Sequence, residues 1–112
     1  IFNNYLLGLA IIPITNLKYY KESDNMFIVY ADRQIDISTI NLEQNIRLFK
    51  EGENEQLQTA IEPLPQEYLH LSGQGFAWSH QEQGFGDYFA TITGIKDATG
   101  KTFPDLTIRF SI

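Results

Sequence analysis

The sequence predicts a mainly β protein, an antiparallel β-sandwich or a small barrel, with one short helix allowed near residues 42–51. Three observations lead to this expectation. About six to eight short apolar runs are separated by turn residues, as in all-β domains. The last seven residues alternate strictly between apolar and polar types. The chain has 112 residues, enough for one hydrophobic core, so residues 1–112 are expected to form a single β domain.

The clearest predicted element is a hairpin at the C-terminal end. Residues 106–112 place apolar side chains at every second position, which is typical of a strand with one face against a core. Residues 88–95 are rich in aromatic and β-branched types, which favour strands. Between the two runs, Asp97 and Gly100 supply turn chemistry.

Three further strands are expected in the N-terminal half. Residues 26–31 form a continuous apolar run bounded by polar residues, which predicts a strand buried on both faces. Residues 35–39 alternate in polarity, so a second hairpin through residues 32–34 is expected. Residues 5–14 are apolar at odd and even positions alike, and Gly8 and Pro13 favour a strand over a helix there.

The middle of the chain supports two interpretations. Asn41 is a good N-cap for a helix over residues 42–51 that closes at Gly52. Alternatively, residues 45–50 and 55–61 are two strands joined by a turn at residues 51–54. Pro63 and Pro65 then force an extended connector, and the next strand is expected to begin at Tyr68.

The charge is unevenly distributed. The net charge is −6, which argues against nucleic acid or an anionic membrane as the partner. No Lys or Arg occurs between Lys50 and Lys96, and this interval holds seven acids: Glu51, Glu53, Glu55, Glu62, Glu67, Glu82 and Asp87. If they share one face, that face attracts a basic protein or cations; otherwise it is a solvated surface that serves solubility.

The composition places few limits on location. Without cysteine, neither a disulfide framework nor a thiolate metal site is available. The apolar run at residues 5–14 is too short to span a bilayer and no basic residue precedes it, so no membrane insertion is expected. Because the chain begins with Ile1, we expect a processed product or a piece of a larger protein.

The candidate contact surface lies in residues 68–89. If residues 73–75 form a hairpin loop, one face of the pair carries aromatic and histidine side chains: Tyr68, His70, Phe76, Trp78 and His80. With Leu69, Leu71 and Ala77 turned to the core, this face would suit sugar rings or a partner's side chains. Alternatively, Phe76 and Trp78 are themselves core residues.

A second turn presents Phe85. It lies between Gly84 and Gly86, and an aromatic residue at such a loop tip is a candidate contact residue.

Catalytic and metal motifs are incomplete. His70, His80, Glu67, Glu82 and Asp87 have ligand chemistry but no ligand spacing, so neither a metal nor another cofactor is predicted. Residues 94–102 approximate a phosphate-binding loop but have one residue too many between the glycines and no helix start after them. Residues 70–75 approximate a nucleophile elbow but lack its first glycine.

One resemblance covers residues 90–112. Asp97, Gly100, Pro104 and the alternating end resemble the hairpin of bacterial Ig-like surface repeats and of carboxypeptidase-regulatory-like β-sandwiches. This resemblance implies a non-catalytic module of an extracytoplasmic protein, in the periplasm or at the cell surface.

The resulting hypothesis is a non-catalytic binding or assembly module of a larger or multi-subunit protein. It would contact a protein partner or neighbouring subunit, a basic one in particular, through the acidic and aromatic middle third. One alternative is a carbohydrate-binding module that uses Trp78 and the neighbouring aromatic residues. A second is a structural subunit in which residues 5–14 pair with a neighbouring chain. A third is a small hydrolase with a histidine and a carboxylate.

Overall fold

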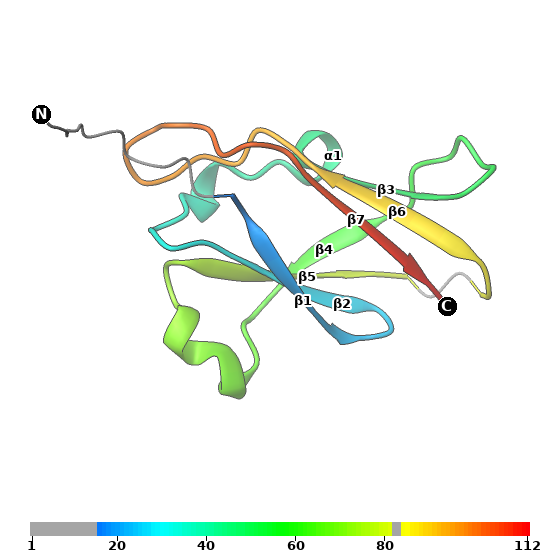
Figure 1. Cartoon of the computed structure of the whole chain (residues 1–112), viewed down its shortest axis with the longest axis horizontal. Coiled ribbons are helices and arrows are strands. Elements are labelled where there is room, and N and C mark those ends of the chain that lie inside the picture. Colours follow the sequence, from blue (N-terminus) through cyan, green and yellow to red (C-terminus); the bar gives the residue numbers. More distant parts are fainter. Residues whose placement is uncertain (1–15, 82–83) are drawn as a thin grey trace, which may run out of the picture.

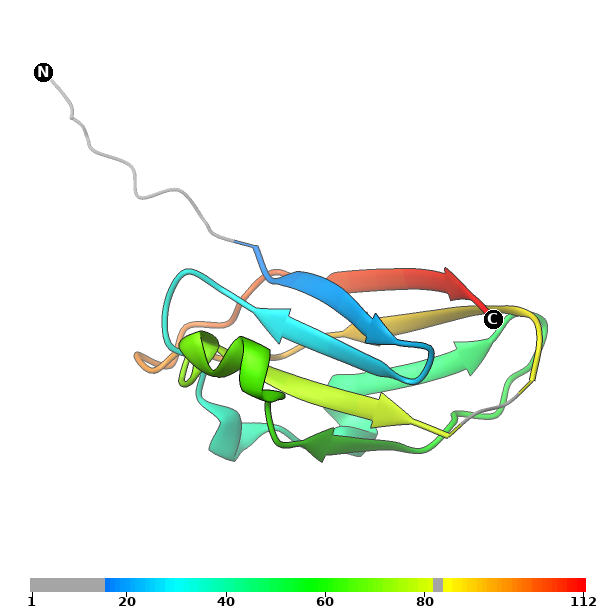
Figure 2. The same cartoon turned by 90° about the horizontal axis from the view of Figure 1, so that it is seen from below.

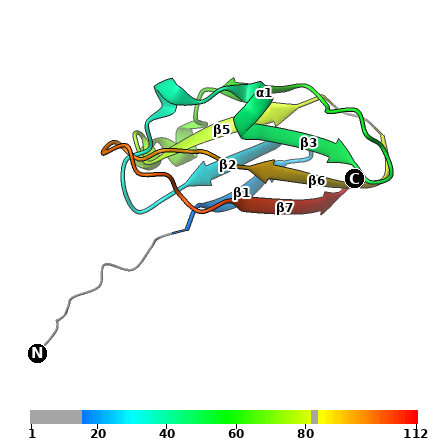
Figure 3. The ribbon, with the colours of Figure 1, turned by 90° about the horizontal axis from the view of Figure 1, so that it is seen from above.

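The computed structural model describes residues 16–81 and 84–112, and in them seven strands form two antiparallel sheets packed face to face (Figure 1). One sheet has the strand order β1-β2-β5-β4, with β1 Lys18–Ser23, β2 Met26–Tyr30, β5 Gly75–His80 and β4 Thr59–Glu62. The other has the order β3-β6-β7, with β3 Ile46–Lys50, β6 Asp87–Ile92 and β7 Leu106–Ser111. Figure 2 shows the first sheet nearer the viewer and Figure 3 the second. The predicted β-sandwich is confirmed.

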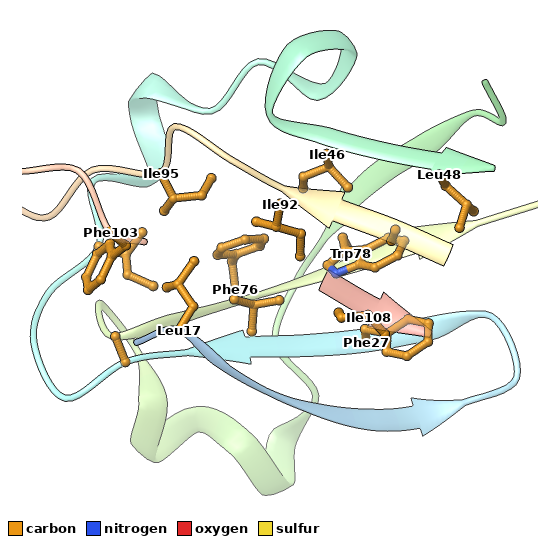
Figure 4. Packing of buried hydrophobic residues seen from close by; sticks show 14 of the residues in the cluster. Leu17, Phe27, Ile46, Leu48, Phe76, Trp78, Ile92, Ile95, Phe103 and Ile108 are labelled. Carbon is orange, nitrogen blue, oxygen red and sulfur yellow. The ribbon is translucent and has the colours of Figure 1, made fainter. Parts of the chain in front are cut away.

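The core lies between the two sheets (Figure 4). The larger sheet contributes Phe27 and Val29 from β2 and Phe76 and Trp78 from β5. In the register, Phe27 is opposite Trp78 and Val29 is opposite Phe76, and the Phe27 and Trp78 rings stack with centroids 4.9 Å apart. The smaller sheet and its flanking loops contribute a second set of side chains: Ile46, Leu48, Tyr88, Ala90, Ile92, Ile95, Phe103 and Ile108.

The C-terminal hairpin is confirmed. Strands β6 and β7 pair in register from Asp87 opposite Ser111 to Ile92 opposite Leu106. The connection between them turns at Asp97, whose carboxylate accepts hydrogen bonds from the backbone N–H groups of Thr99 and Lys101. Gly100 completes the turn with a φ of +90°, a conformation that glycine adopts without steric cost.

The buried strand predicted at residues 26–31 is confirmed as β2, but the hairpin predicted after it is wrong. Residues Ile37–Thr39 form a 3₁₀ helix, η1, and Ile35 makes only an isolated bridge to Asp97. The cause is local, since Asp36 accepts hydrogen bonds from the hydroxyls of Ser38 and Thr39 and so competes with strand pairing. Strand β2 pairs instead with β1, a strand that the sequence analysis missed.

In the middle of the chain, each interpretation is partly correct. Asn41 caps a helix, accepting a 3.0 Å hydrogen bond from the Glu43 backbone N–H, but this helix, α1, spans only Leu42–Asn45. Strand β3 follows at once because Ile46 and Leu48 are both fully buried, at the period of a strand. Strands β3 and β4 belong to different sheets, and an isolated bridge joins Leu48 of β3 to Leu57 in the connection before β4.

The strand expected from Tyr68 is also wrong. Residues Gln66–Leu71 form a 3₁₀ helix, η2, that begins after Pro65, whose carbonyl accepts from the Tyr68 N–H at 2.9 Å. This helix lies against the outer face of the larger sheet (Figure 2). On that face Ile28 and Ala77 are fully buried although they point away from the main core. The strand predicted at residues 5–14 lies outside the described residues.

Candidate functional site

The structure does not assemble the predicted aromatic and histidine face. Tyr68 and His70 lie on η2, whereas Phe76, Trp78 and His80 lie on β5 and are 2%, 0% and 4% exposed. The hairpin expected around residues 73–75 is therefore wrong, because the segment that would be its first strand is a 3₁₀ helix. The alternative, in which Phe76 and Trp78 are core residues, is confirmed.

Burial of Trp78 contradicts the carbohydrate platform built on it. An indole that stacks on a sugar must expose one ring face to solvent, and Trp78 exposes none. Its ring instead packs between the sheets, against Phe27.

His80 is also enclosed by aromatic rings. Its ring centroid lies 5.4 Å from that of Phe110 and 6.1–6.4 Å from those of Trp78, Phe27 and Tyr88. Its Nδ1 is 2.8 Å from the Gln81 carbonyl oxygen, so this nitrogen carries the proton and donates. Its Nε2 is buried without a hydrogen-bond partner among the described residues. In the described part of the chain, no hydrogen bond or ion pair joins this imidazole to a carboxylate.

Within residues 16–81 and 84–112, no three histidine, aspartate or glutamate side chains gather where they could hold a metal ion. In the same residues, no helix has both the length and the apolar character needed to cross a bilayer.

Phe85 has the exposure expected of a contact residue. Its side chain is 88% exposed, and its neighbours Gly84 and Gly86 have φ of +84° and +152°. The backbone beneath it is held on both sides, because the Tyr88 hydroxyl donates to the Gly84 carbonyl at 2.7 Å and Gly86 forms two backbone hydrogen bonds with Ile112, 2.9 and 3.0 Å long. The Phe85 tip, residues 84–86, thus presents an apolar ring on a fixed backbone.

The acidic side chains do not lie on one wall. The acidic loop, residues 51–55, connects β3 to β4 at the same end of the sandwich as the Phe85 tip, and the Glu51 N–H donates to the Asp87 carbonyl at 2.8 Å. Strand β4 then carries the chain to the opposite end, where η2 holds Glu67 (Figures 1 and 2). The acids are divided because the segment runs the length of the molecule; Glu82 lies outside the described residues.

A tyrosine cluster on the larger sheet was missed. The rings of Tyr20 and Tyr30 stack 5.0 Å apart, and Tyr68 of η2 lies 5.9 Å from Tyr20. A hydrogen bond with Tyr20 raises the pKa of Tyr30, and a hydrogen bond with the Glu22 carboxylate raises the pKa of Tyr68. The signal that could have found it is the Asp24–Asn25 turn between residues 18–23 and the predicted strand.

An apolar groove at the other end of β5 was also missed. It has a volume of about 360 Å³, and three of its lining residues are large apolar side chains with substantial exposure: Ile37 at 38%, Ile61 at 37% and Leu69 at 54%. Pro63, Leu64, Gly75 and Phe76 line it as well. These residues come from η1, β4, η2 and the start of β5, so local sequence patterns do not group them.

Comparison with known proteins identifies the fold. No protein-family model and no curated protein matches the chain. Two solved structures do match, the surface layer protein SbsC, domains 1–6, and the S-layer protein rSbsC(31-844). The fold is that of a part of SbsC. The TM-score is 0.64 for both, with 19% and 18% sequence identity over 96% and 89% of this chain. The chain spans 14% of the length of each SbsC structure.

Proposed function

We propose that this chain is a non-catalytic assembly module of a larger extracytoplasmic protein and that it contacts a neighbouring protein through the end carrying the Phe85 tip and the acidic loop. The observation that carries the proposal is the 88% exposure of Phe85 on a backbone held by Tyr88 and Ile112. Covering this ring in a contact would remove its apolar surface from water, which is favourable. The shared fold with SbsC, whose name describes a surface layer protein, supports a location at the cell surface.

The strand order supports an Ig-like assignment for the module. Lettered A to G along the chain, the strands form an ABED sheet facing a CFG sheet, the order of constant-type immunoglobulin sandwiches. Tyr88, near the start of the sixth strand, donates its hydroxyl proton to the backbone four residues upstream, as the tyrosine of an Ig tyrosine corner does. Ig-like sandwiches place their loops at two ends, where neighbours in an assembly can reach them.

The charge of the acidic loop favours a basic partner. Glu51 forms an ion pair with Arg109, with 3.3 Å between Oε1 and Nη1. Among the described residues, Glu53 and Glu55 form no ion pair, and both are exposed. Two unpaired carboxylates at the same end of the sandwich as an exposed aromatic ring suit a partner surface with an apolar centre and a basic rim.

Single cysteines test this proposal, because the native chain has none. Glu53→Cys is placed in the acidic loop, and Thr107→Cys is the matched exposed control on β7. In the full-length parent protein, maleimide labelling is compared between the intact cell surface and the released protein. Protection of Glu53→Cys alone on the cell surface is the expected result. Equal labelling of both cysteines in both states would contradict the proposal.

The tyrosine cluster favours a glycan as a second candidate ligand. Tyr20 is 48% exposed, and aromatic rings with polar edges on a sheet face suit sugar rings. Affinity electrophoresis in gels containing soluble polysaccharides tests it. Retardation that Tyr20→Ala abolishes would support this candidate, and equal mobility of the native and variant chains in every gel would exclude it.

A further inference from the structure

We infer that copies of this chain associate head to tail, with the Phe85 tip of one copy inserted in the apolar groove of the next. This rests on the proposed assembly function and assigns its partner as a second copy. The tip and the groove lie at opposite ends of β5, since the groove is lined by Gly75 and Phe76 and the tip follows His80 at the far end. Each copy therefore carries both the tip and the groove, and its own tip does not occupy its own groove.

The two surfaces match in size and chemistry. The groove volume of about 360 Å³ exceeds that of one phenylalanine side chain, and its rim is formed by three partly exposed aliphatic residues, Ile37, Ile61 and Leu69. Phe85 is the most exposed of the large hydrophobic residues that the structure describes. Burying both removes the largest apolar exposures at the two ends at the same time.

The loops beside these surfaces carry complementary charge. The acidic loop, which holds Glu53 and Glu55, lies at the same end of the sandwich as the tip, because the Glu51 N–H donates to the Asp87 carbonyl. The basic loop, residues 96–101, flanks the groove, because the Lys96 carbonyl accepts from the Asp36 N–H next to Ile37. Among the described residues, Lys96 and Lys101 form no ion pair, so both can meet a second copy's carboxylates.

The charged loops orient one copy relative to the next, but they do not provide most of the affinity. Glu62 lines the groove, and Glu67 lies on η2 at the same end, so only the side facing the basic loop attracts an acidic loop. The Glu62 carboxylate is already engaged by the Ser79 hydroxyl at 2.6 Å. Insertion of Phe85 therefore provides most of the affinity, and added salt should weaken the association only modestly.

The geometry also fixes the kind of assembly. A tip and a groove on opposite ends make a heterologous contact, in which each copy uses two different surfaces. Such a contact leaves one free tip and one free groove on a pair, so further copies add to form closed rings or open chains.

Sedimentation velocity of the complete chain tests the inference from about 10 μM to about 1 mM, the range of weak complexes. The native chain is expected to form dimers and larger assemblies as its concentration rises. Phe85→Ser and Leu69→Glu should each weaken self-association by about tenfold or more, the effect of losing one buried apolar side chain. Tyr19→Ser, at a 39% exposed aromatic outside both surfaces, should associate like the native chain.

Mixing the two variants distinguishes this contact from any symmetric one. The Phe85→Ser chain keeps an intact groove and the Leu69→Glu chain keeps an intact tip, so the mixture should form one-to-one dimers and nothing longer. A native chain that stays monomeric throughout, or a mixture without dimers, would overturn the inference. If Glu53→Cys is protected on the cell surface while the isolated chain stays monomeric, the assembly function stands and its partner is a different protein.

Discussion

Arg33 and Asp97 are joined by a 2.8 Å hydrogen bond between Nε and Oδ2 that ties the loop after β2 to the β6–β7 connection. Asp97 is 3% exposed and also accepts from the Thr99 hydroxyl at 2.6 Å. The Thr99 hydroxyl, then the Lys101 backbone N–H and Arg33, lower the Asp97 pKa from 3.8 to about 2, against the opposing effect of burial. The arrangement holds the basic loop against η1.

This arrangement predicts acid sensitivity. Because the pKa of Asp97 is lower in the folded chain, its contribution to stability is complete above about pH 4 and is lost as the pH falls through about 2. Asp97→Asn lacks this contribution, so its urea midpoint should be lower than the native one at neutral pH and should converge towards it below about pH 3. Urea unfolding followed by tryptophan fluorescence measures this, and parallel pH profiles of the two proteins would refute it.

Tyr88→Phe should cost about 1 kcal/mol of unfolding free energy, the net value of one hydrogen bond. The ring itself is retained, and with it the stacking on Phe110 at 5.3 Å. The cost stays small because Gly84 is exposed, so water can hydrate its freed carbonyl. Tyr19→Phe is the control, with an expected change within about 0.5 kcal/mol. Equal unfolding free energies for the two variants would show that the Tyr88 hydrogen bond contributes nothing.

The C-terminal hairpin and the start of α1 could be predicted because their sequence signals are local. Strand β7 alternates apolar and polar residues because only one of its faces meets the core, and a turn marked by Asp97 and Gly100 joins it to its partner β6. The short helix after Asn41 was anticipated for the same reason, because capping is a local interaction.

The predictions that were wrong concern elements that depend on contacts between residues distant in the sequence. Strand β5 is buried on both faces, with Phe76 and Trp78 towards the main core and Ala77 on the outer face of the sheet, so alternation cannot tell which face is inside. The alternation of Leu69 and Leu71 with polar residues indicated a strand. In the structure these residues belong to η2, which lies against the outer face of the larger sheet. The groove residues come from four separate elements, and only folding brings them together.

Trp78→Ala should destabilise the protein by about 3–5 kcal/mol, the range for large aromatic residues deleted from a core. The matched variant Phe85→Ala should change stability by no more than about 0.5 kcal/mol, because its ring is 88% exposed. Chemical unfolding followed by circular dichroism suits both variants, since one lacks the reporter indole. Strong acrylamide quenching of Trp78 in the native chain would contradict its placement between the sheets.

Gly75→Ala should be among the most damaging of the glycine substitutions, although Gly75 has ordinary strand geometry. A Cβ there would lie 2.9 Å from the Val29 carbonyl oxygen and 3.1 Å from the Tyr30 Cβ, both fixed by the β2–β5 pairing. Since neither atom can move without opening the sheet, we expect the unfolding free energy to fall by about 2–3 kcal/mol.

Gly52→Ala is the matched control, because its φ of +85° is unfavourable for alanine but nothing lies within 4 Å of the added carbon. Its cost should be about 1 kcal/mol, from the backbone conformation alone. Thermal or urea unfolding measures the stability of both variants. If Gly75→Ala is as stable as Gly52→Ala, β2 and β5 are less closely packed at Gly75 than the structure shows.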